Sequence, residues 1–264
     1  GVSVTIDGNR ATTGRVPFFS TNAKTGQTVH GFGNLSAHFD GLSLLNYEIH
    51  ADDVDHPVFL WIPMAGQEVD IQGYAQGTFN LFGIGFETWL DGDVTISDMS
   101  MTMGIKGLPY WYEPAYVTST SFNVKTGKGV KFFYTNSPNP IISATLTENQ
   151  SFSFTYDHLT DEFEVDGTFA FRSGEIYYFQ KNFFITEGSM VLHTDAISGS
   201  SAVIPRINLR AKVTDFDSVG NRVDIFLVLR DSTLTSLNPY FESIPTKEVN
   251  EIMEILGQSI LPTG

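Results

Sequence analysis

The chain has 264 residues, of which 41% are hydrophobic and 13% aromatic, and its formal net charge is -15. This apolar content excludes a disordered polyanion, and the excess of carboxylates argues against nucleic acid, whose phosphates require clustered Lys and Arg. The absence of cysteine excludes disulfides, thiol nucleophiles and cysteine-bound zinc. No Lys or Arg occurs between Lys24 and Lys106, so an anionic membrane surface would repel this part of the chain.

The first hundred residues alternate apolar and polar side chains with the period of two that is typical of β-strands. The alternation is clear in residues 2–6, 42–49 and 69–81, and Asp7-Gly8-Asn9 predicts a tight turn after the first of these strands. These residues therefore predict a series of short strands.

A change of phase occurs within residues 94–103. Val94 and Ile96 share one face of the predicted strand, whereas the methionines at positions 99, 101 and 103 fall on the other. A β-bulge near Ser97-Asp98 would return all five side chains to one apolar face.

Residues 109–114, with the sequence Pro-Tyr-Trp-Tyr-Glu-Pro, interrupt the alternation and predict a loop. This loop is the best candidate for a boundary between an N-terminal repetitive β segment over residues 1–108 and a C-terminal β segment over residues 115–264. We expect the two segments to form one continuous sheet.

Beyond the loop the predicted strands are longer and one face is strongly aromatic, with turns predicted at residues 159–161, 180–182 and 187–188. The side chains of this apolar face are Phe152, Phe154, Tyr156, Phe163, Val165, Phe169, Phe171, Ile176, Tyr178, Phe183, Ile185, Met190, Leu192, Ile207, Leu209, Val213, Val223, Ile225, Leu227 and Leu229.

One short amphipathic helix is predicted over about residues 246–257. Thr246 is a suitable N-cap, Glu248 lies in the first turn, where the helix dipole favours an acid, and Gly257 is a natural C-terminal stop. The apolar positions follow helical spacing and are Val249, Ile252, Met253 and Leu256. We expect this helix to cover one end of the sheet and to block pairing at its edge.

Residues 50–56 contain enough imidazole and carboxylate for a divalent metal ion. The candidate ligands are His50, Asp52, Asp53, Asp55 and His56. Their spacing lacks the order and the glycine pivot of an EF-hand, so a solvated turn between two strands is the preferred interpretation. The sequence therefore predicts neither a metal site nor another cofactor.

Catalytic constellations are also missing from the sequence. Glu162, Glu164 and Asp166 share a strand face and have the chemistry of a glycosidase pair, but that face is the polar one, where carboxylates normally meet water. No nucleophile elbow, zinc-protease helix, phosphate loop or dinucleotide fingerprint occurs. We therefore expect that the chain is not an enzyme.

The apolar strand face allows two interpretations. In one, two sheets close over an ordinary core, as in a β-sandwich adhesin or carbohydrate-binding module, and Tyr110, Trp111 and Tyr112 form the binding platform. In the other, a bent open sheet offers its apolar face to hydrocarbon. Periodicity does not separate the two.

The C-terminal third resembles the C-terminal domain of the TamB family within the AsmA-like proteins. The resemblance rests on residues 174–178, 181–192, 205–211, 223–229 and 237–252, which occur in the order of that family. The last of these stretches contains Pro239-Tyr240-Phe241-Glu242-Ser243-Ile244-Pro245, followed by the predicted helix with Glu248 and Ile252. The first 140 residues carry no such landmark.

Members of this family are long periplasmic proteins of diderm bacteria, anchored in the inner membrane by an N-terminal helix. The resemblance implies a long antiparallel, meandering sheet folded into a half-open apolar trough, the β-taco, in which the aromatic face lines a groove for lipid. The implied function is a conduit that carries phospholipid acyl chains toward the outer membrane. The implied partners are phospholipid or another acyl-chain lipid and a BamA-like outer-membrane protein such as TamA, with membrane contact only through parts outside this sequence.

Overall fold

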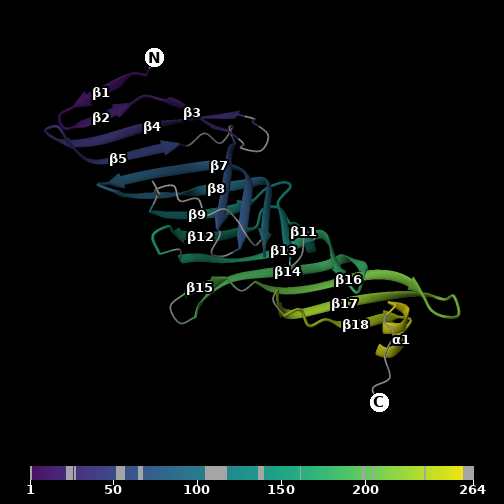
Figure 1. Ribbon diagram of the computed structural model, residues 1–264. Coiled ribbons are helices and arrows are strands. Elements are labelled where there is room, and N and C mark those ends of the chain that lie inside the picture. Colours follow the sequence, from purple (N-terminus) through teal and green to yellow (C-terminus); the bar gives the residue numbers. More distant parts are fainter. Residues whose placement is uncertain are drawn as a thin grey trace.

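The computed structural model describes most of the chain, namely residues 2–21, 26, 28–51, 57–64, 68–104, 118–135, 140–160, 162–197, 200–203, 205–234 and 236–257. Within this part the protein is almost entirely β-stranded, with one short helix near the C-terminal end (Figure 1). The all-β class predicted from the sequence is confirmed. The half-open trough stays a prediction.

The strands are arranged along an elongated sheet, and many of the consecutive strands form hairpins (Figure 1). In chain order they are β1 (Val4–Asp7), β2 (Arg10–Thr13), β3 (Val16–Thr21), β4 (Thr28–Asp40), β5 (Ser43–Ala51), β6 (Val58–Met64), β7 (Val69–Ile84), β8 (Glu87–Met103), β9 (Ser119–Thr126), β10 (Lys131–Thr135), β11 (Pro140–Leu146), β12 (Ser151–Asp157), β13 (Glu162–Tyr178), β14 (Lys181–Ile197), β15 (Ser200–Val203), β16 (Arg206–Phe216), β17 (Arg222–Thr233) and β18 (Tyr240–Ile244).

Long strands alternate with pairs of short strands that lie end to end. β5 and β6 pair with the two halves of β7, β9 and β10 with the two halves of β8, and β12 and β11 with the two halves of β13. Arm A consists of β5, β9 and β12 and of the halves of β7, β8 and β13 that pair with them. Arm B consists of β6, β10 and β11 and of the other halves of β7, β8 and β13. The long strands run through both arms.

The sheet is mixed, whereas the sequence predicted an antiparallel meander. β8 pairs in parallel with both β9 and β10, and the other pairings are antiparallel. The reason is that β9 starts at the same end of the sheet as β8, where Thr118 donates its backbone N–H to the Thr88 carbonyl at 2.7 Å. Because these pairings join β8 to β9 and β10, the sheet runs on across the predicted boundary at residues 109–114.

The predicted bulge in residues 94–103 is confirmed. Asp98 adopts a left-handed φ of 44°, and the β7–β8 register shifts between Gln72 and Tyr74 on the opposite strand. As a result Val94, Ile96 and the three methionines of β8 lie on one buried face. The bulge lies where arm A meets arm B, so it bends the sheet at the junction of the arms.

Two of the predicted turns differ from the structure. The β13–β14 hairpin turns at Phe179 and Gln180, whose φ values of 48° and 57° give the left-handed backbone of a tight two-residue hairpin turn. Residues 187–188 lie inside β14, beside a register shift between Ile185 and Glu187. The bulged residue is Thr186, and Gly188 pairs with Leu209 at a point where a side chain would press on Leu209 and Phe171.

The helix α1 (Val249–Ile255) is shorter than predicted. Its N-cap is Glu248 and not Thr246, because the Ser243 hydroxyl accepts the Lys247 N–H at 2.8 Å and the Glu251 carboxylate accepts the Glu248 N–H at 3.0 Å. Gly257, with a φ of 80°, follows the C-cap as predicted.

Two carboxylates stabilise this end of the sheet. Asp217, in the β16–β17 turn, accepts the backbone N–H of Asn221 at 2.8 Å and the Lys247 ammonium at 3.1 Å, and these contacts lower the pKa of Asp217 to about 2. Hydrogen bonds from Lys212 at 2.8 Å and from Thr214 lower the pKa of Asp224 to about 2 as well.

These pKa shifts predict acid-sensitive stability. Both folded-state pKa values lie below the ordinary value of 3.8, so the stabilisation is complete above about pH 4 and is lost as the pH falls toward 2. We expect the urea midpoint of the wild-type protein to fall between pH 5 and pH 2.5, and D217N and D224N each to show a smaller fall. Equal pH dependence in all three proteins would contradict the assignment.

Candidate functional site

Apolar side chains line up across the strands on one face of the sheet, which we call the inner face. In arm A the register aligns Phe79, Gly92, Phe122, Phe154 and Val165 in one row over five strands. The rings of Phe79 and Phe122 meet edge to face with centroids 5.9 Å apart across Gly92, where a side chain would collide with the neighbouring backbone. The inner face is therefore a continuous ladder of apolar and aromatic groups.

An apolar pocket lies where the inner faces of the two arms meet, and we call it the seam. Arm B contributes Leu60, Val69, Ile71, Met99, Met101 and Met103. The residues from arm A and the adjoining end of β14 are Val94, Ile96, Phe122, Val124, Phe152, Phe154, Val165 and Leu192. The cavity within the seam has a volume of about 50 Å³. Every side chain that lines it is apolar.

The predicted apolar face lies around and beyond the seam. All of its residues belong to or pack against one apolar cluster, except Phe163, whose side chain lies outside the described part. Five are only half-buried, namely Phe152, Tyr156, Tyr178, Ile185 and Val213. The buried ones are Phe154, Val165, Phe169, Phe171, Ile176, Phe183, Met190, Leu192, Ile207, Leu209, Val223, Ile225, Leu227 and Leu229.

Most of the seam itself was absent from the sequence prediction of the site. Only Phe152, Phe154, Val165 and Leu192 of the predicted face line it. The missing contribution comes from β6 to β9, and above all from the methionines of β8. The sequence could have predicted that these methionines line the site, because the predicted bulge at residues 97–98 already placed them on the apolar face.

The C-terminal end of the inner face is covered. Phe241 of β18 stacks on Phe179 with ring centroids 5.9 Å apart, and Tyr178 and Phe183 complete the aromatic group. Beyond it α1 buries Ile252 and Leu256. The helix thus covers one end of the sheet, as the sequence predicted.

At the N-terminal end of the inner face, the described residues leave apolar side chains exposed. β1 presents Val4 and Ile6 with 58% and 75% of their surface exposed. Ile6 pairs with Ala11, which in turn pairs with the buried Ala37 of β4, so these side chains continue the inner face. β1 and α1 lie at opposite ends of the elongated sheet (Figure 1), and the apolar face is therefore open at one end and closed at the other.

A buried phenol interrupts the apolar wall in arm B. Tyr134 of β10 is 9% exposed and pairs with Met103. Burial raises the pKa of Tyr134, and the nearby Glu68 carboxylate raises it further. The phenol is therefore neutral at neutral pH, and it adds no charge to the inner face.

His50, one of the residues considered as metal ligands, lies on the outer face. His50 hydrogen-bonds through Nδ1 to Asn80, whose amide nitrogen donates to Asp91 at 2.8 Å. The other candidates, Asp52, Asp53, Asp55 and His56, lie outside the described residues. Within the described part, no three His, Asp or Glu side chains are grouped so that they could hold a metal ion.

The carboxylates considered for catalysis also lie on the outer face, in the polar phase that the alternation predicted. Glu162, Glu164 and Asp166 are exposed, and the Asp166 carboxylate lies 3.5 Å from His193 Nδ1. Tyr110, Trp111 and Tyr112, the platform of the sandwich interpretation, lie outside the described residues.

Comparison with known proteins gives no relative for this chain. No family model, no curated protein and no solved structure matches it. Among the described residues, no helix has the length and apolar character needed to cross a membrane. The resemblance to the TamB family therefore stays a prediction.

The cavity in the seam predicts that one added methylene is tolerated there. Val124→Ile should stabilise the protein by up to about 1 kcal/mol, since a buried methylene contributes about 0.8 kcal/mol where room exists. Val223→Ile is the control, because Val223 is fully buried away from the seam and overpacking costs about 1–3 kcal/mol. Urea unfolding measures both, and a destabilised Val124→Ile variant would show that the cavity does not accept the group.

Proposed function

We propose that this chain binds the acyl chains of lipids along its inner face and in the seam, as a segment of a lipid conduit. The observation that carries the proposal is the seam, where two arms of one sheet meet through apolar side chains alone. The open end at β1 and the covered end at α1 favour entry from the N-terminal end.

The energetics of such a site suit movement. Each buried methylene contributes about 0.8 kcal/mol, so a tail that buries about ten methylenes gains about 8 kcal/mol before the costs of association. The seam is lined by apolar side chains alone, so no position within it holds the tail in a deep minimum. A headgroup remains in water, and sliding needs no catalytic step.

The seam must widen to admit a tail. Its cavity of about 50 Å³ is far below the roughly 300–1,000 Å³ of ordinary ligand pockets. The bulge at Asp98 interrupts the strand pairing at the junction of the arms, so it is the place where the angle between them changes most easily. The flexible methionines opposite the aromatic rings are suited to repacking around a guest.

The resemblance to the TamB family agrees with this proposal and extends it. On that basis we propose a periplasmic setting, phospholipid as the cargo and a BamA-like outer-membrane protein as a partner. The proposal requires no enzyme activity and no cofactor. These extensions rest on the resemblance alone.

The experiment is native mass spectrometry of gently purified protein. The wild-type chain should retain masses of lipid, and Val94→Phe should lose them because the larger ring fills the seam. Thr95→Phe is the matched control, since the neighbouring side chain points to the outer face and its substitution should leave lipid retention unchanged. Circular dichroism checks that each variant keeps its strands.

Two outcomes would contradict the proposal. One is wild-type protein that carries no lipid and takes up none from added phospholipid, which would identify the seam as an ordinary core. The other is equal lipid retention in the folded Val94→Phe and Thr95→Phe variants, which would place the lipid elsewhere.

A further inference from the structure

Three hairpin tips carry large apolar side chains that contact almost nothing in the protein. Leu42, between β4 and β5, is 104% exposed, and Phe86, between β7 and β8, is 102% exposed. Leu159, between β12 and β13, is 71% exposed. Single apolar side chains on a surface are ordinary, but three at hairpin tips call for an explanation.

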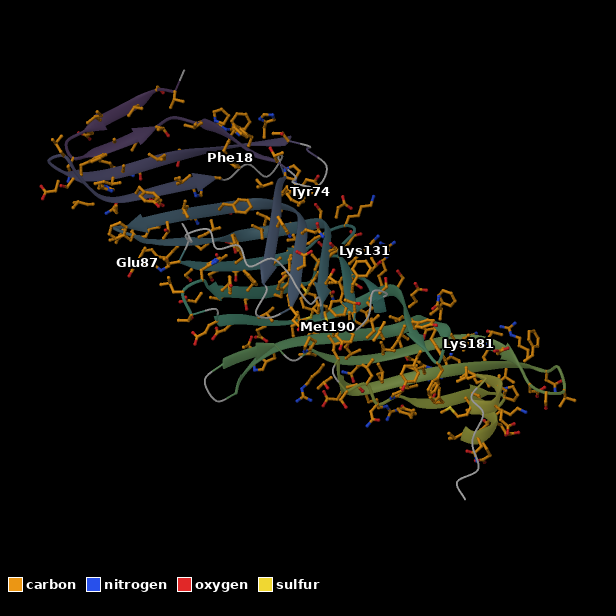
Figure 2. The ribbon with its side chains drawn as sticks, viewed as in Figure 1. Phe18, Tyr74, Glu87, Lys131, Lys181 and Met190 are labelled. Carbon is orange, nitrogen blue, oxygen red and sulfur yellow. The ribbon has the colours of Figure 1, made fainter. Side chains whose placement is uncertain are left out.

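The three tips lie along one rim of the sheet. β5 and β8 both start at this rim, and β7 and β12 both end at it. In Figure 2 the rim is at the left, where Glu87, the neighbour of Phe86, is labelled. Ser119 pairs with both Trp89 and Asp157, so the tips with Phe86 and Leu159 lie at the same level. At about 4.8 Å per strand, these two tips are about 14 Å apart.

An aromatic pair stands just behind the rim. Trp89 of β8 lies three residues from Phe86, and its ring centroid is 5.8 Å from that of Phe82 on β7. Both side chains are half-buried and lie on the outer face. The tryptophan thus lies a few residues further from the rim than the apolar tip. This arrangement suits a membrane–water interface, where a tryptophan ring lies at the level of the lipid headgroups.

The conformation of one tip is fixed by a carboxylate. Asp157 accepts the backbone N–H of Leu159 at 2.8 Å and that of Thr160 at 3.0 Å. These bonds hold the turn so that the Leu159 side chain protrudes. The exposure of Leu159 is therefore built into the hairpin.

The charged residues nearest to each tip along the chain are acidic. Asp40, Glu87 and Asp157 flank them, and the two N-terminal tips belong to the stretch that has no Lys or Arg. An anionic surface is therefore unfavourable. A protein partner is also a poor fit, because the tips are single side chains separated by polar turns and do not form one contiguous patch. A fluid hydrocarbon layer accepts each tip independently.

We propose that this rim docks on a zwitterionic lipid bilayer, with Leu42, Phe86 and Leu159 inserted at the boundary between headgroups and acyl chains. The expectation from the resemblance was membrane contact only through parts outside this sequence, and the rim adds a contact within it. This proposal does not rest on lipid binding in the seam.

The test is flotation of the protein with neutral phosphatidylcholine vesicles. Wild-type protein should float, and the double variant Leu42→Ser/Phe86→Ser should bind more weakly, by about tenfold for each side chain removed. Val219→Ser is the matched control, because Val219 is 82% exposed at the tip of the β16–β17 hairpin on the opposite rim. Anionic lipid added to the vesicles should weaken binding of the wild type.

A label at the tip provides the second measurement. Since the chain has no cysteine, Phe86→Cys and Val219→Cys each introduce a unique site for a polarity-sensitive fluorophore. Vesicles should shift the emission to the blue at position 86 and leave position 219 unchanged. Equal shifts at both positions, no shift at either, or flotation that survives the double serine substitution would overturn the proposal.

The two proposals fail separately. Val94→Phe should still float with vesicles, because the seam is not part of the rim. A Val94→Phe variant that is folded but no longer floats would assign the membrane contact to the seam and would overturn the role of the rim.

Discussion

The one-sided apolar face of the sheet is the constraint on which the rest of the structure depends. A sheet this long, with Phe122, Phe154 and Phe169 on the same side, exposes more apolar surface than water tolerates unless that side is covered. The described part of the chain contains only one short helix with which to cover it. Instead the sheet bends at the Asp98 bulge, so that the inner faces of arm A and arm B cover each other at the seam.

The two ends of the inner face differ in how well they are covered. At the C-terminal end the Phe179–Phe241 stack and α1 close the inner face, and at the N-terminal end β1 leaves Val4 and Ile6 in water. An apolar guest that enters beside β1 would travel toward a covered end. The rim of hairpin tips lies along the side of the same path, so a bilayer docked there would place lipid close to the open part of the inner face.

Local patterns in the sequence predicted the class of fold and the apolar face, because both depend on alternation within single strands. Even the bulge in β8 was predictable, since one extra residue between Ile96 and Met99 is the simplest way to keep both side chains on the same face. Single signals were less reliable. Glycine at position 188 fits a turn and a close contact between strands equally well. The N-cap is Glu248 and not Thr246 because Glu248 and Glu251 form a reciprocal capping box.

The seam could not be predicted in this way. It exists because two halves of the same long strands meet, and periodicity assigns both halves to the same face without saying that they touch. The parallel pairing of β8 with β9 and β10 was equally unpredictable, since it depends on the end of the sheet at which β9 begins.

The most direct test of this account measures the distance between the arms by pulsed electron paramagnetic resonance. Spin labels at Ser143→Cys in arm B and Ser153→Cys in arm A, both on the outer face, should move apart when a phospholipid is added. A control pair at Asn34→Cys and Ser153→Cys, which spans several strands of arm A, should keep its distance. If bound lipid leaves the distance between Ser143 and Ser153 unchanged, the arms do not open and the seam is not the lipid site.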